Sequence, residues 1–408
     1  MALVGLSACA GQSTAPTFTN PNPIVIGTSL SFSKDFASDG MAMAQGYQLW
    51  ADTVNNNGGL LGRQVKLEIL HDDSSEAMVQ SNYSSLIKQH VDLLFGPFSS
   101  LLTKAALDAP GISKYAFIEG AGGTDTVFSK AQSKHVNLFD VSLPVDNNLI
   151  TFAYYILSLP QQDRPTTAAY LTSDDPFTFP QVYKAEALLE QAGVKTVYVN
   201  QYTELDNTKA TLDKATADIK QLIQKRAQVV ILGTLLPDIQ LEVSLFKQAH
   251  YNPKDMIATA GPDAGQDFIN RVGGYKYADG VFVPNGWYPQ ANNFQNQAMV
   301  NAYTGQYHVT PDQINADVAE AFSVGQVLEQ AVEKTQSIDN AKIIADLQKG
   351  DVFNTVQGTA QFHPASAPDA GQNIQSIAYL FQWQGTQFIP VYPYSVAAEN
   401  PEPKPGNY

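Results

Sequence analysis

Short apolar runs alternate with helical repeats along most of the chain, beginning at Ile24. Each run is short enough for one buried strand, and the segments between the runs repeat apolar residues every three or four positions, which predicts helices. This alternation is typical of βαβ units stacked on a parallel sheet. The predicted strands cover residues 24–27, 65–70, 91–95, 116–119, 168–172, 197–199, 229–232, 256–260, 281–283, 359–362, 377–382 and 388–392.

The series of strands and helices starts twice, first at Ile24 and again near Asp146. A chain of 408 residues is also longer than one hydrophobic core comfortably supports, so two domains are the natural expectation. After residue 283 the pattern becomes mainly helical, and strands return only near the end. We therefore predict two similar doubly wound α/β lobes, with the last third of the chain contributing to both.

The charge balance is strongly negative, with 39 acidic against 24 basic residues and a formal net charge of −15. This balance argues against nucleic acid or an anionic membrane surface as a partner. No stretch approaches the roughly 20 apolar residues that a membrane-spanning helix needs. Solubility is a sufficient explanation of the acidity.

Motifs for catalysis are absent from the sequence. It has no phosphate-binding glycine loop followed by Lys and Ser or Thr, no GxGxxG between a strand and a helix, and no GxSxG elbow. Its six histidines show no HxH or HxxxH spacing for a metal. We therefore predict a binding protein without cofactor or metal, while an enzyme whose site assembles from distant residues stays an alternative.

The N-terminal segment holds the single cysteine, Cys9, so no disulfide can form within this chain. Residues 6–9 (LSAC) resemble a bacterial lipobox, in which the cysteine becomes acylated. The basic start and longer apolar core of a signal peptide are missing, so a stray cysteine is the alternative. We expect residues 1–23 to be a signal remnant, lipobox and flexible tether, residues 397–408 to be a flexible tail, and a lipid anchor to be the only membrane association.

Two loops of the first series offer groups suited to a carboxylate. In open parallel sheets, ligands bind beyond the carboxyl ends of the strands. Residues 96–100 (GPFSS) and 120–125 (GAGGTD) place glycines and hydroxyls where the next helix begins. Free backbone N–H groups at that place favour an anion. The alternative is that Ser100 and Thr124 only cap their helices.

The second series offers one acidic and two aromatic candidates. Asp263, within residues 261–265 (GPDAG), is suited either to a ligand ammonium or to capping the next helix. Phe177 and Trp287 lie just past predicted strands. Aromatic side chains there either stack on a ligand or close the edge of a core.

Residues 30–73 closely resemble the start of type I periplasmic binding proteins of the branched-chain amino acid (Leu/Ile/Val-binding) ABC importer family. The most specific mark is N-x-x-GG-(L/I)-x-G-x-x-V, here residues 55–65, followed by the double aspartate Asp72-Asp73. The resemblance covers about residues 24–393. Its other marks are the serine loop at 96–100 and a closing segment at 355–362, 382–383 and 391–393.

This resemblance implies the type I periplasmic binding protein fold, in which three crossover strands join two hinged lobes around a ligand. Lobe 1 would comprise residues 24–143 and 289–370, and lobe 2 residues 144–288 and 371–396. Clefts between domains are common ligand sites, and a few crossover residues absorb the closing rotation.

The resemblance also implies roles for single residues. Ser100, with Ser99 beside it, would hold the ligand carboxylate. Asp263 stands where the family has the acid that pairs with the ligand ammonium, and Phe177 stands near a stacking aromatic. The other implied contacts are Gly122, Gly123 and Thr124 in a second carboxylate loop, and Phe32 or Phe36 in the pocket wall. Glu119 departs from the family's pattern, and we assign it and Trp287 to the pocket wall from their places at the ends of strands.

The expected function is that of an extracytoplasmic solute-binding protein of an ABC importer. It would capture an amino acid or a related small carboxylate or amide and deliver it to permease subunits in the membrane. Glu119 and Trp287 favour a more polar or aromatic ligand than leucine. A ligand-sensing receptor module on the same fold and, less favoured, an enzyme stay open as alternatives.

Overall fold

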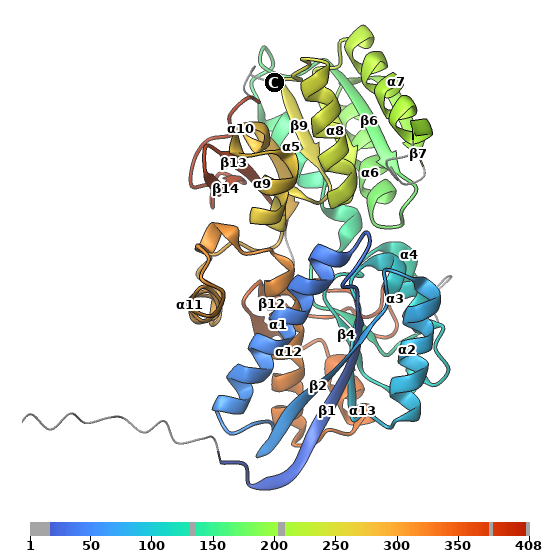
Figure 1. The fold of residues 1–408 in the computed structure, drawn as a ribbon, viewed down its shortest axis with the longest axis vertical. Helices are drawn as coiled ribbons and strands as arrows, with labels where there is room; N and C mark the ends of the chain where they lie inside the picture. Colours follow the sequence, from blue (N-terminus) through green and yellow to red (C-terminus); the bar gives the residue numbers. More distant parts are fainter. Residues whose placement is uncertain (1–16, 130–134, 203–208, 375–377, 405–408) are drawn as a thin grey trace, which may run out of the picture.

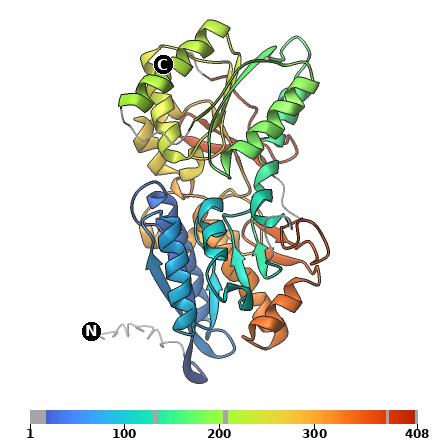
Figure 2. The same ribbon diagram turned by 90° about the vertical axis from the view of Figure 1, so that its right-hand side faces the viewer.

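The computed structural model describes residues 17–129, 135–202, 209–374 and 378–404. The chain forms two α/β lobes stacked along the long axis of the molecule (Figures 1 and 2). Each lobe is built on its own sheet. The predicted organisation into two α/β lobes is confirmed.

Lobe 1, the lower lobe in Figure 1, contains a sheet of parallel strands in the order β2-β1-β3-β4-β5. Its short strands are buried on both faces, as parallel strands between helices are. In β3, Leu93 and Phe95 join one hydrophobic cluster while Leu94 joins the other. The strands are β1 (Asn20–Leu30), β2 (Arg63–His71), β3 (Leu93–Phe95), β4 (Phe117–Glu119) and β5 (Leu138–Asp140).

The helices of lobe 1 come from both ends of the chain. Buried residues of the late helices, such as Val300 and Phe322, share one core with Ile24 and Tyr47. The chain therefore returns to lobe 1 after building most of lobe 2. These elements are α1 (Ala37–Asn56), α2 (Glu76–Lys88), α3 (Ser100–Leu107), η1 (Ile112–Lys114), α4 (Asp125–Phe128), α11 (Asn296–Tyr307), η4 (Pro311–Gln313), α12 (Asp317–Thr335), α13 (Asn340–Leu347), β11 (Phe353–Thr355) and β12 (Gly358–Ala360).

Lobe 2 contains a mixed sheet in the order β14-β13-β10-β9-β8-β6-β7. Strands β7, β6, β8, β9 and β10 are parallel, and β13 and β14 extend this sheet in antiparallel pairing. The elements are η2 (Val145–Asn147), α5 (Ile150–Ser158), β6 (Thr167–Ser173), α6 (Thr178–Gln191), β7 (Lys195–Tyr202), α7 (Lys209–Lys225), β8 (Val229–Gly233), α8 (Leu236–Gln248), β9 (Asp255–Ala258), η3 (Pro262–Ala264), α9 (Gln266–Val272), α10 (Tyr275–Ala278), β10 (Val281–Asn285), β13 (Tyr379–Gln384) and β14 (Gln387–Tyr392).

The predicted strands of the two parallel series are all present, with ends shifted by a few residues. The sequence analysis missed β5, because three residues carry too little pattern to mark a strand. It also placed a strand at 359–362, where the structure has the hairpin of β11 and β12.

Residues 398–404, expected within a flexible tail, lie against lobe 2. The backbone N–H of Glu402 donates to Oε1 of Gln382 at 2.9 Å. Lys404 is 5 % exposed, and its Nζ donates to the carbonyl oxygen of Asp279 at 2.9 Å. The segment is held because its polar groups find partners at the end of the sheet while the lysine stem is covered.

Helices α1 and α12 pack closely through two glycines. A Cβ at Gly46 of α1 would lie 2.3 Å from the carbonyl oxygen of Val318, and a Cβ at Gly325 of α12 would lie 2.2 Å from Cδ2 of Trp50. The two contacts advance together along both helices, so the helices run in the same direction. The indole Nε1 of Trp50 also donates to Oε2 of Glu329 at 3.1 Å.

Replacing Gly325 by valine should lower the free energy of unfolding by about 1–3 kcal/mol, because the added atoms overlap the Trp50 ring. Chemical denaturation followed by tryptophan fluorescence measures this change. The matched control is Gly305→Ala in α11, where a Cβ would meet nothing within 4 Å. That change should be neutral or stabilise by up to about 1 kcal/mol, since alanine favours a helix. Equal losses in both variants would contradict the close packing of α1 on α12.

Candidate functional site

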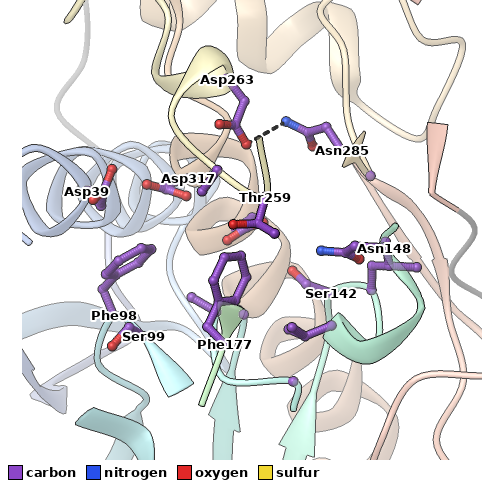
Figure 3. A pocket seen from close by; sticks show the side chains of 18 of the residues that line it. Asp39, Phe98, Ser99, Ser142, Asn148, Phe177, Thr259, Asp263, Asn285 and Asp317 are labelled. Atoms are coloured by element: carbon purple, nitrogen blue, oxygen red, sulfur yellow. Dashed lines mark hydrogen bonds between the residues drawn. The ribbon is translucent and has the colours of Figure 1, made fainter. Parts of the chain in front are cut away.

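A cavity with an empty volume of about 870 Å³, part of it open to solvent, lies between the lobes. Lobe 1 contributes residues that follow β3 and β4, and lobe 2 contributes residues that follow β8, β9 and β10. The cavity therefore lies at the carboxyl ends of strands from both sheets, where loops and helix starts present polar groups. Figure 3 shows the side chains that line it.

The two lobes contact one another beside the cavity. The Oγ1 of Thr124 in lobe 1 lies 3.1 Å from the carbonyl oxygen of Pro176 in lobe 2. The backbone N–H of Ala316 donates to the carbonyl oxygen of Asp263 at 3.3 Å. Leu235 of lobe 2 is buried in a hydrophobic cluster of lobe 1. Rotation of one lobe away from the other would break these contacts and open the cavity.

Ser99 brings a hydroxyl group to the cavity. Its backbone has φ 135° and ψ 176°, a conformation that costs a residue other than glycine about 1–3 kcal/mol. The side chain is 4 % exposed, and its Oγ has no hydrogen-bond partner. Ser100, predicted as the main carboxylate contact, begins α3 and is buried away from the cavity lining. The structure thus puts the neighbouring serine at the cavity, because the chain turns into the helix between them.

Glu119, at the end of β4, occupies backbone donors of the loop that follows. Its Oε2 accepts the N–H of Ala121 at 2.8 Å and the N–H of Gly122. Its carboxyl group also interacts with that of Asp140, the residue opposite Glu119 in the pairing of β4 with β5. Burial raises the pKa of Glu119 to about 7. Burial and the charge of Glu119 raise the pKa of Asp140 well above its usual range.

The second predicted carboxylate loop reaches the cavity only in part. Gly123 lines the cavity, whereas Gly122 and Thr124 do not. The Thr124 hydroxyl lies 3.1 Å from Oδ1 of Asp146 and contacts the other lobe, so it is already engaged. Glu119, predicted as a wall of the pocket, lies behind the loop. The loop that was expected to hold a ligand carboxylate holds a carboxylate of the chain itself.

Asp263 reaches the cavity from lobe 2 (Figure 3). Its Oδ1 accepts a hydrogen bond from the N–H of Gly261 at 2.9 Å, and its Oδ2 accepts one from Nδ2 of Asn285 at 3.4 Å. These neutral donors orient the carboxyl group without cancelling its charge. Burial raises its pKa to about 7. This placement is compatible with the role expected for Asp263, the binding of an ammonium group, which stays a prediction.

The sequence analysis missed three acidic residues of the cavity. Asp39 lies in the first turn of α1, and Asp317 and Glu320 lie in the first turn of α12. Figure 3 shows Asp39 and Asp317 near one another, below Asp263. In the sequence nothing marks them, because acids in the first turn of a helix are ordinary partners of its dipole. Among the residues that the structure describes, no Lys, Arg or His lines the cavity.

Burial raises the pKa of each of these carboxyl groups. That of Asp39 rises to about 6, and its carboxyl group hydrogen-bonds that of Asp317. The pKa of Asp317 lies well above its usual range because of burial and the charges of Asp39, Glu320 and Asp263. The pKa of Glu320 is raised in the same way, by burial and then by the charge of Asp263. In the empty cavity, burial and neighbouring like charges therefore favour the protonated forms of these carboxyl groups.

The aromatic candidates divide between the cavity and the cores. Phe177 lines the cavity as expected, together with Phe98, which was not predicted. Phe36 and Trp287 are 3 % and 2 % exposed within the cores of lobe 1, where apolar neighbours surround their rings. Phe32 is 37 % exposed and stacks on His71 instead, with ring centroids 5.4 Å apart.

In the described part of the chain, no group of three or more His, Cys, Asp or Glu side chains is arranged to hold a metal ion. No helix of that part is both long and apolar enough to cross a membrane. Cys9, the predicted lipidation site, lies outside the described residues.

Solved structures that resemble the chain include binding proteins of ABC transporters. The branched-chain amino acid transporter substrate-binding protein LivJ from Streptococcus pneumoniae, solved with isoleucine, matches with a TM-score of 0.74 at 18 % identity, over 90 % of this chain and 98 % of that one. A solute-binding protein from R. palustris, solved with benzoate, matches with a TM-score of 0.71 at 16 % identity, over 93 % and 98 %. The leucine-binding protein LivK from Thermotoga maritima matches with a TM-score of 0.73 at 16 % identity, over 90 % and 97 %.

At these identities the solved structures establish the fold alone. No curated protein sequence matches the chain. A sequence profile of the periplasmic binding protein family, in contrast, matches residues 23–387. This range includes the strands of both sheets apart from β14 and the start of β1, and every residue that lines the cavity. The chain therefore belongs to the periplasmic binding protein family.

Proposed function

We propose that the protein is the extracytoplasmic solute-binding subunit of an ABC importer, and that it captures a small solute with a protonated amine between its lobes. The observation that carries this proposal is the composition of the cavity wall. Both lobes supply it from the carboxyl ends of their strands, and it presents Asp263 from one lobe toward polar groups of the other. A solute bound there contacts both lobes and stabilises the closed arrangement.

Capture combines charge pairing with removal of water. The ligand ammonium pairs with Asp263, which Gly261 and Asn285 hold in place. Phe98 and Phe177 give apolar surface to the rest of the solute. Closing the lobes excludes water, and this strengthens the charge pairing because the local dielectric falls. Crossover segments between the sheets absorb the rotation.

Delivery to a permease and membrane attachment through Cys9 are parts of the same proposal. The importer role is supported by family membership and by solved neighbours named as ABC transporter binding proteins. An acylated Cys9 would tether the protein beside its permease, with the residues between Cys9 and β1 as the spacer; residues 20–23, expected within this tether, belong to β1.

Support for an amine group on the ligand is stronger than support for a carboxylate group. Ser99 offers one free hydroxyl to an anion, but Glu119 occupies the loop amides that the resemblance assigned to a carboxylate. The family's fold and the amine contact therefore agree with the expectation of an amino acid or related compound. The carboxylate contact has weaker support.

Asp263→Asn should weaken binding of an amine ligand by roughly 2–5 kcal/mol, because a desolvated ammonium loses its charged partner. Isothermal titration with the solute found by screening measures the change. Asp213→Asn is the control, since Asp213 is exposed on α7, where it pairs with Lys209, outside the cavity lining. Unchanged affinity in Asp263→Asn would show that no ammonium group binds there.

Ligand binding should make the protein more compact and more stable. We expect a thermal-shift panel of amino acids, amines, amides and aromatic acids to contain a solute that raises the melting temperature. At 100 times its dissociation constant such a solute adds about 2.7 kcal/mol of stability. Small-angle scattering with this solute should show a smaller radius of gyration. If no solute of the panel stabilises the protein and none co-purifies with it in native mass spectrometry, the proposed function is wrong.

A further inference from the structure

The cavity holds more negative charge than one ammonium group requires. Asp263 alone would balance a single ammonium, yet Asp39, Asp317 and Glu320 line the same cavity from lobe 1. All four side chains are partly accessible, since they face the cavity rather than a core. No basic side chain among the described lining residues compensates them.

Helix stabilisation explains only part of this arrangement. Asp39 and Asp317 lie in first turns, where the helix dipole favours an acid. One acid for each helix satisfies that preference, but α12 carries Asp317 and Glu320 on the side that faces the cavity. Asp263 then approaches from the other lobe, and its charge raises the pKa of Glu320. An empty cavity gains nothing from placing these acids together.

Two polar atoms of the lining lack partners. The Oγ of Ser99 belongs to a side chain that is 4 % exposed and makes no hydrogen bond. The Oδ1 of Asn148 is likewise buried without a donor. Buried polar atoms normally have partners. The amide oxygen of Asn148 can only accept, so it suits a bound group that supplies hydrogen-bond donors, whereas the Ser99 hydroxyl suits either a donor or an acceptor. Protonated amines are such donors and accept no hydrogen bonds.

The position suited to a ligand carboxylate is filled from within the protein. Glu119 accepts the N–H groups of Ala121 and Gly122. A second carboxylate brought to this loop would face Glu119 and Asp140 without a basic partner. Neighbouring like charges in a buried site repel one another, and this repulsion opposes binding of a carboxylate.

We infer that the ligand is a diamine or polyamine, with two or more protonated nitrogen atoms and no carboxylate group. This inference rests on the proposed function, since it names the solute that the cavity captures. One nitrogen pairs with Asp263 in lobe 2. The other pairs with Asp317 and Glu320 in lobe 1, while Phe98 and Phe177 cover the methylene chain and attract the cations through their ring faces.

Titration calorimetry with putrescine, spermidine, leucine and benzoate tests the solute class directly. We expect at least one amine to bind saturably, with one site per chain. This binding should persist at a salt concentration on the order of 0.5 M, because salt screens exposed charges much more than buried ones. Leucine binding more tightly than both amines overturns the inference and leaves the proposed function intact, whereas benzoate binding more tightly than both amines overturns the inference and the proposed amine contact. Amine binding that is lost in salt or exceeds one site also overturns it, because a chain of net charge −15 attracts polyamines to its surface.

Asp317→Asn and Glu320→Gln should each weaken binding of the amine by about 30-fold or more, which corresponds to about 2 kcal/mol for one lost charge pair. Both substitutions remove a charge that neighbouring acids already oppose, so we expect the ligand-free melting temperature to stay or rise. Asp213→Asn is the control for net charge, because Asp213 is exposed on α7 and pairs with Lys209. Equal effects of all three substitutions, or no effect of the two cavity substitutions, would reject the site.

The affinity for the amine should rise as the pH rises from 5.5 to 8. The pKa values of about 6 for Asp39 and about 7 for Asp263 mean that protons occupy the empty site at the lower pH. The amine must displace these protons, and it stays charged throughout this range. Asp317 and Glu320 face the same site, and Arg271, the basic group that acts on Asp39, is paired with Asp267. We expect a change of about tenfold or more in the dissociation constant. A dissociation constant that is independent of pH, or that rises with pH, would contradict pairing with these carboxyl groups.

Discussion

The packing of α12 against α1 is the contact on which the cavity depends. Gly46 and Gly325 let the two helices approach closely, and their contacts show that the helices run in the same direction. Both N-termini therefore lie at the end of lobe 1 that faces lobe 2. Because α12 belongs to the last third of the chain, this end of the cavity is completed only when the late helices have returned to the first lobe.

The same packing sets the electrostatic character of the site. Asp39, Asp317 and Glu320 come to the cavity on the first turns of the two helices, and Asp263 meets them from lobe 2. Burial and mutual repulsion raise their pKa values, so protons substitute for a cation while the site is empty. The protonated carboxyl groups lower the free-energy cost of burying these four side chains on folding. A cationic solute then displaces protons as well as water when it binds. The carboxyl groups of such a site ionise when a cationic ligand binds.

Glu119 shows how one residue changes what a shared loop does. The loop after β4 has the glycines and backbone amides that suit a ligand carboxylate, and the solved neighbours bind isoleucine and benzoate on the same fold. Here the last residue of β4 turns its own carboxyl group onto two of those amides. These two amides are therefore less available to an external anion. Fold similarity at these identities therefore leaves the ligand open.

The sequence by itself determined the fold class, the parallel strands and the loops that carry the site, because hydrophobic periodicity and strand-to-helix loops are local signals. It also identified Asp263, Ser99, Gly123 and Phe177, which follow strands whose carboxyl ends face the cavity. It could not separate Ser99 from Ser100, since the first turn of α3 decides which hydroxyl points outward. Nor could it find Asp39, Asp317 and Glu320, which look like ordinary helix-start acids until tertiary packing brings α1, α12 and η3 together. Which charges share one cavity depends on distance in space, and only the tertiary structure sets that distance.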